Sequence, residues 1–217
     1  MDFSSISSAI FAVGRTDIAG VQLRGTAFLL NKPGCFATAF HVVGTDDRNL
    51  VLAFKEVATL HEYQDTSNKQ VRNFPAKILA ADPFHDLVVL KTEWRGLSQM
   101  RIGGTDSAPV GTLISSFGFP HADHGRMVLT QQDTAIGARV LIESGGIKSK
   151  HVVLNTQARP GQSGSPVLKR ADGELVAILV GSYAPGGGGA ILLGGVDPST
   201  LHQTTQAVSA EYLLNMY

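Results

Sequence analysis

In residues 160–166, Pro-Gly-Gln-Ser-Gly-Ser-Pro, Ser163 lies between two glycines, Gly161 and Gly164. The hydroxyl of Ser163 can act as a nucleophile when a neighbouring base takes its proton. The glycines leave backbone N–H groups uncovered, and such groups can stabilise the negative charge that develops on an attacked carbonyl oxygen. The segment therefore predicts acyl-transfer chemistry and requires a base elsewhere in the chain.

Two residues that could complete this chemistry lie upstream. His41 follows the run 38–40, and Asp86 opens the apolar run 87–90; they are 45 residues apart, and Ser163 lies 77 residues after Asp86. A histidine can take the proton of the serine, and an aspartate can hold the imidazole in the useful tautomer. Each residue alone is more often part of a turn or a core. Together, in the order His, Asp, Ser, they predict a catalytic triad.

This order is that of the chymotrypsin-type double barrel, and the chain resembles a trypsin-like serine protease, most similar to the bacterial HtrA or Deg branch. The resemblance implies a serine endopeptidase with an acyl-enzyme intermediate, a triad of His41, Asp86 and Ser163, an oxyanion hole made by the amides of Gly161 and Ser163, and neither cofactor nor metal. The segments that carry it are 25–30, 38–43, 82–91, 116–120 and 155–167.

Short apolar runs between glycine, proline, asparagine and aspartate predict many strands and few helices. With the resemblance, they predict an all-β fold of two six-stranded antiparallel β-barrels and a short C-terminal helix over 207–217, with Ser209 as its N-cap. We expect one peptidase domain, 1–217, made of barrels at 1–103 and 104–217. The predicted strands are 25–30, 35–40, 49–54, 76–79 and 87–91 in the first barrel and 112–117, 127–131, 135–142, 152–155, 166–169 and 175–180 in the second.

Composition limits the partners. Eighteen basic and eighteen acidic residues give a formal net charge of zero, and no basic block marks a nucleic-acid or membrane surface. The single cysteine, Cys35, allows no disulfide within the chain. Asp2 stands where a signal peptide would be basic, and the apolar patch 9–13 is too short to span a membrane, so we expect a cytoplasmic protein.

Three residues depart from the family pattern. Phe40 replaces a small residue before the histidine, and Ser165 replaces the second glycine after the serine. Gln162 replaces the aspartate of digestive relatives, which pairs with a newly freed amino terminus, so the resemblance implies no activation of that kind. Phe40 either disturbs the imidazole or fills a gap in the barrel.

The resemblance also places the pocket for the side chain before the scissile bond. By family spacing Gln157 lies near its floor, with Ala158 beside it and Val180 in its wall. None of these carries a charge, so we expect a preference for small or medium uncharged side chains. Asp197 could add a carboxylate from a downstream loop, and the glycine run 186–189 makes that loop difficult to place.

A protein or peptide substrate is the expected partner. No PDZ domain is recognised in the 217 residues, which favours a dedicated protein substrate, and a regulatory or activator protein, over general quality control. One alternative is a catalytically impaired, protease-like module that binds peptides. A second is hydrolysis of an ester by the same triad. The complete triad favours catalysis, and the long cleft expected between two barrels favours a polypeptide.

Overall fold

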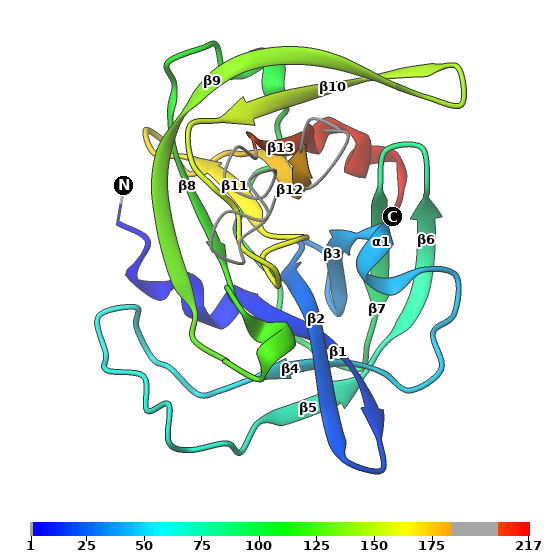
Figure 1. The fold of residues 1–217 in the computed structure, drawn as a ribbon, viewed down its shortest axis with the longest axis vertical. Helices are drawn as coiled ribbons and strands as arrows, with labels where there is room; N and C mark the ends of the chain where they lie inside the picture. Colours follow the sequence, from blue (N-terminus) through cyan, green and yellow to red (C-terminus); the bar gives the residue numbers. More distant parts are fainter. Residues whose placement is uncertain (1, 184–203) are drawn as a thin grey trace, which may run out of the picture.

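The structure is a computed structural model, and it describes residues 2–183 and 204–217. The glycine run 186–189 and Asp197 lie outside the described residues. Two antiparallel β-sheets follow one another along the chain and form two halves of the molecule (Figure 1). The predicted double-barrel architecture is confirmed.

The first half is a seven-stranded sheet in the order β5-β4-β1-β2-β3-β7-β6. Its edge strands β5 and β6 are consecutive in the sequence, with Ala76 alone between them, so one bent segment supplies both edges. Counted as one strand, this segment gives the six strands that the sequence predicts. The bounds are β1 Ile10–Asp17, β2 Gly20–Leu29, β3 Cys35–Ala39, β4 Leu50–Phe54, β5 Arg72–Pro75, β6 Lys77–Asp82 and β7 Leu87–Lys91.

The second half is a closed barrel of six strands in the order β10-β13-β12-β11-β8-β9, as the sequence predicts. The predicted strands 127–131 and 135–142 overlap a single long strand, β9, which begins at Thr130, so residues 127–129 lie outside any strand. The bounds are β8 Leu113–Gly118, β9 Thr130–Ser144, β10 Ile147–Leu154, β11 Pro166–Lys169, β12 Leu175–Tyr183 and β13 Thr204–Ser209.

Continuous apolar strands separate two layers of core. In β7, Leu87 and Val89 face a cluster shared by both halves, whereas Val88 and Leu90 face a cluster inside the first half. Side chains alternate across a strand, so both faces of β7 are buried. β1 is buried in the same way, with Ile10 and Ala12 on one face and Phe11 and Val13 on the other, and it was not among the predicted strands.

The predicted C-terminal helix is shorter than expected. Residues up to Ser209 belong to β13, where Ala207 and Val208 are fully buried, and only Ala210–Asn215 form a helix, of 3-10 type (η5). Ser209 stands at the N-cap position without capping the helix. Its hydroxyl instead accepts the N–H of Thr105 at 3.0 Å.

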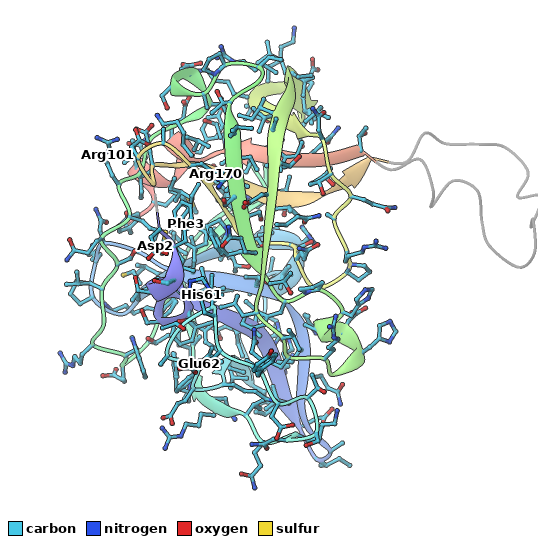
Figure 2. All side chains as sticks on the ribbon, turned by 90° about the vertical axis from the view of Figure 1, so that its left-hand side faces the viewer. Asp2, Phe3, His61, Glu62, Arg101 and Arg170 are labelled. Atoms are coloured by element: carbon cyan, nitrogen blue, oxygen red, sulfur yellow. The ribbon has the colours of Figure 1, made fainter. Side chains whose placement is uncertain are left out.

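The other helices are short, of three to six residues, and the segment that carries η1 lies at the junction of the two halves. Phe3, just before η1, packs edge-on against Phe117 of β8 with ring centroids 5.1 Å apart, and Figure 2 shows it between the two sheets. The N-terminal segment therefore bridges the halves. The helices are η1 Ser4–Ala9, α1 Phe40–Val43, η2 Thr105–Ser107 and η3 Ala122–His124.

Ser165 provides a test of the packing at this junction. Its side chain is fully buried, and its hydroxyl has no hydrogen-bond partner among the described residues. Because an unpaired buried hydroxyl is costly, Ser165→Ala should raise the free energy of unfolding by about 1 kcal/mol in chemical denaturation. Ser115 is equally buried but donates to Asp133 at 2.7 Å, so Ser115→Ala should lower it. Equal losses in the two variants would contradict this interpretation.

Candidate active site

The pairing of two strands brings His41 to Asp86. Ala39, at the end of β3, is paired with Leu87, at the start of β7, so the residues just beyond these strand ends are neighbours. The carboxylate of Asp86 accepts the backbone N–H of His41 at 2.8 Å and lies 2.6 Å from its ring Nδ1. A carboxylate can only accept, so Nδ1 carries the hydrogen and Nε2 is left as an acceptor.

A tight turn presents Asp86 to the histidine. Asp86 has a φ of 54°, in the left-handed region that aspartate tolerates better than most residues. Asp82 builds the turn, because its carboxylate accepts the N–H groups of Phe84 and His85 at 3.1 and 3.2 Å. The His85 ring lies 2.5 Å from Asp82 Oδ2 and stacks on Tyr212 of η5. No role for Asp82 was predicted from the sequence.

Phe40 stands behind the histidine. Its side chain packs against the core of the first half, and its N–H donates to the carbonyl of Asp86 at 2.9 Å. The sequence left open whether Phe40 disturbs the imidazole or fills a gap in the barrel. In the structure Phe40 fills space against the core, and His41 keeps both of its bonds to Asp86. A further histidine, His151, is buried nearby, and burial lowers its pKa.

Residues 159–165, which we call the serine loop, are attached to the first half through Thr26 of β2. The N–H of Thr26 donates to the carbonyl of Ser163 at 2.8 Å, and its hydroxyl donates to the carbonyl of Gly161 at 2.9 Å. The same hydroxyl accepts the N–H of Phe119 at 3.2 Å. Thr38 closes the arrangement by donating to the Thr26 carbonyl at 2.6 Å. Neither threonine stood out in the sequence as a positioning residue.

Two glycines allow this close approach. A Cβ on Gly164, whose φ is +87°, would lie 2.1 Å from the Thr26 carbonyl oxygen and 2.2 Å from the Thr38 hydroxyl. A Cβ on Gly25 would lie between the Val42 side chain and the Ser163 carbonyl, at 2.7 and 2.9 Å. Ser163 therefore lies beside the helical turn that carries His41, and the segment before β11 can be followed to β2 in Figure 1.

The peptide between Pro160 and Gly161 has a defined direction. The Pro160 carbonyl accepts the N–H of His121 at 2.7 Å. In a trans peptide the C=O and N–H point in opposite directions, so the N–H of Gly161 points away from His121. Within the described part of the chain, neither Gly161 nor Ser163 donates its amide to an acceptor.

Thr205 of β13 joins the predicted pocket residues to the barrel wall. This fully buried hydroxyl accepts the N–H of Ala158 at 2.7 Å and donates to the Thr156 carbonyl at 2.7 Å. The Gln157 carbonyl accepts from the side chain of Gln132 at 3.3 Å. Residues 156–158 are thus fixed from two strands.

Val180 lies on the strand that borders the serine loop. Its neighbour Leu179 accepts the N–H of Gly164 at 2.7 Å and donates to the Ser165 carbonyl at 2.9 Å. Val180 itself is half-buried and packs against the cores of the junction and of the first half. Gln157 and Ala158 are thus bound by side chains of the second barrel, and Val180 follows the residue of β12 that binds the serine loop.

The hydroxyl of Thr26 should be needed for the stability of the junction. Thr26→Val keeps the shape but leaves the Gly161 carbonyl without its donor and the Phe119 N–H without its acceptor. We expect the free energy of unfolding to fall by about 1–3 kcal/mol in chemical denaturation. Thr16 on β1, whose hydroxyl has no partner in the described residues, is the control, and Thr16→Val should change stability by less than about 0.5 kcal/mol. Equal effects would show that the Thr26 bonds carry no special weight.

Curated relatives include probable periplasmic serine endoproteases described as DegP-like. One from Chlamydia muridarum is 29% identical over 186 residues, which cover 82% of this chain and 32% of the relative. One from Pseudomonas fulva is 28% identical over 171 residues, covering 77% and 31%. The chain thus spans about a third of the length of these relatives. No helix among residues 2–183 and 204–217 has the length and apolar character to cross a membrane.

Solved structures share the fold. The apo protease domain of MamO from Magnetospirillum magneticum has a TM-score of 0.70 at 15% identity and covers 100% of this chain and 99% of that one. The HtrA-type protease AlgW with a tripeptide has a TM-score of 0.69 at 20% identity, with coverage of 98% and 60%. The family model described as "Trypsin-like peptidase domain" matches residues 25–178, and the chain therefore belongs to the trypsin-like peptidase family.

Proposed function

We propose that the protein is a serine endopeptidase that cleaves peptide bonds through His41, Asp86 and Ser163. The observation that carries this proposal is the double contact of Asp86 with the backbone N–H and ring Nδ1 of His41. A carboxylate held in this way fixes both the position and the tautomer of the imidazole. A histidine fixed so has its Nε2 available as a base for a serine hydroxyl.

In the proposed reaction the Ser163 hydroxyl attacks the carbonyl carbon of a peptide bond while His41 Nε2 takes its proton. The tetrahedral intermediate collapses, the C–N bond breaks, and the imidazolium gives its proton to the leaving amine. Water then attacks the carbonyl carbon of the acyl-enzyme while His41 takes its proton. The imidazolium returns a proton to Ser163 Oγ as the ester bond breaks and the carboxylic acid product leaves. Asp86 stays ionised throughout and stabilises the imidazolium.

The amides of Gly161 and Ser163 form the proposed oxyanion hole. Support comes from the direction of the Pro160–Gly161 peptide and from the absence of an acceptor for either amide in the described residues. Donors that already point at the developing charge need no rearrangement during the reaction. Each such donor is typically worth about 10²–10³ in rate.

The proposed substrate is a polypeptide with a small or medium uncharged side chain before the scissile bond. The neutral residues Gln157, Ala158 and Val180 would line the pocket, and the buried Thr205 hydroxyl accepts the backbone N–H of Ala158. Charged side chains would lose hydration there without gaining a partner. The similarity to a structure described as AlgW with a tripeptide supports an extended peptide as ligand.

We further propose a single peptidase domain, with halves at 1–103 and 104–217, that acts on a dedicated protein substrate under the control of an activator protein. The proposed compartment is the cytoplasm, where the one cysteine, Cys35, would stay a free thiol. The names of the relatives say periplasmic of those proteins, so fractionation of the native host is the direct check.

Labelling with a fluorophosphonate probe tests the proposed nucleophile. The parent protein should be labelled, Ser163→Ala should not be, and His41→Ala should be labelled about 10²–10⁴-fold more slowly because the base is lost. Ser165→Ala, a change of another serine in the same loop, should be labelled at the parent rate. Failure of the folded parent to label would mean that the site awaits the proposed activator protein or that the chain is a peptide-binding module without turnover.

A peptide library tests the proposed pocket. The cleavage profile of the parent should favour uncharged side chains such as alanine and valine before the scissile bond. Gln157→Asp should add cleavage after lysine and arginine, because the new carboxylate supplies a counter-charge at the pocket floor. A parent profile dominated by lysine or arginine would overturn the proposed specificity.

A further inference from the structure

The residue before the nucleophile is a buried glutamine with a defined set of partners. Gln162 is 2% exposed, and its side-chain oxygen accepts the N–H of Arg159 at 2.7 Å, three residues back in the same loop. The backbone N–H of Gln162 donates to the Arg159 carbonyl at 3.1 Å. Both bonds close the loop 159–162 on itself, and this loop contains the Gly161 amide.

The amide nitrogen of Gln162 reaches a second glutamine on a different strand. It donates to Gln132 Oε1 of β9 at 3.3 Å. Gln132 Nε2 in turn donates to the Gln157 carbonyl at 3.3 Å and to the Thr156 hydroxyl. The two side chains thus connect residues 159–162, the oxyanion loop, with the proposed pocket floor and with strand β9 in the wall of the second barrel.

The backbone groups at the two ends of this series of hydrogen bonds determine which side-chain atom donates and which accepts in each bond. The N–H of Arg159 can only donate, so it must face the oxygen of Gln162, and the carbonyl of Gln157 can only accept, so it must face the nitrogen of Gln132. The two amides in between then meet nitrogen to oxygen. Neither glutamine can turn its amide over without setting like groups against each other.

We propose that the Gln132–Gln162 pair is the positioning element that holds the Gly161 amide in the orientation needed for catalysis. This inference rests on the proposed function and goes beyond it by assigning residues that hold the site ready without touching the substrate. The pair is neutral, so it needs neither a freed amino terminus nor a change of protonation. Loss of either amide leaves buried polar groups unpaired, which favours rearrangement of the loop.

The rate of inactivation by the fluorophosphonate probe tests this role. Gln132→Ala and Gln162→Ala should each lower the maximal inactivation rate by about 10- to 100-fold, because a misdirected donor weakens transition-state stabilisation. Gln131→Ala is the matched control. Gln131 is an exposed glutamine next along the same strand, its nitrogen bonds Asp133 at 2.8 Å, and its loss should leave the rate unchanged.

Gln132→Glu separates hydrogen bonding from packing. A carboxylate fills nearly the same volume but puts an oxygen where the Gln157 carbonyl requires a donor. We expect it to lose as much rate as Gln132→Ala near pH 7 while remaining folded in a thermal melt. Parent-like rates in Gln132→Glu and Gln132→Ala would overturn the proposal. Full activity in Gln132→Glu alone would reduce Gln132 to a space-filling role, which also contradicts it.

A crystal structure of Gln132→Ala keeps the test independent of activity. The Pro160 carbonyl should leave the N–H of His121, since the loop is no longer held from β9. A carbonyl that stays in place would overturn the positioning role, whether or not the parent is labelled. Failure of the parent to label would instead count against the proposed function, so the two failures are distinguishable.

Discussion

The geometry of the site depends on the hydrogen bonds between Thr26 and the serine loop. Ser163, the proposed nucleophile, and His41, the proposed base, come from different halves of the chain, and their separation is set by how those halves meet. Thr26 donates twice into the loop, to Gly161 and Ser163, at 2.9 and 2.8 Å. Because both bonds join Thr26 in the first half to the serine loop in the second, movement of one half against the other would break both of them.

The same contact explains why small residues surround the site. The serine loop can lie on β2 and β3 only where backbones approach without intervening side chains, as at Gly25 and Gly164. A side chain at Gly164 would meet the Thr26 carbonyl at 2.1 Å and would also have to adopt a φ of +87°. Gly164, the glycine after Ser163, therefore allows the close contact between the two halves as well as the positive φ of the loop.

Sequence patterns predicted the parts of this molecule that depend on local chemistry. The residues His41, Asp86 and Ser163 could be picked out because each stands in a motif, and β7 could be predicted from its apolar run. The hydroxyl of Thr26 could not be assigned, since its partner Gly161 is 135 residues away and a threonine in a strand is common. The pair Gln132–Gln162 was missed for the same reason. Positioning contacts are long-range, and single-sequence patterns record only neighbours.

The framework around the proposed triad is largely neutral. Threonine hydroxyls, glutamine amides and backbone groups hold the serine loop, whereas charge is concentrated in the bonds of Asp86 to His41. Neutral hydrogen bonds do not depend on a protonation state, so the bonds that shape the loop 159–162 do not depend on one either. A contact that moves this loop would therefore alter the site, and the bond from the His121 N–H to the Pro160 carbonyl shows that the residue just before η3 is held against it.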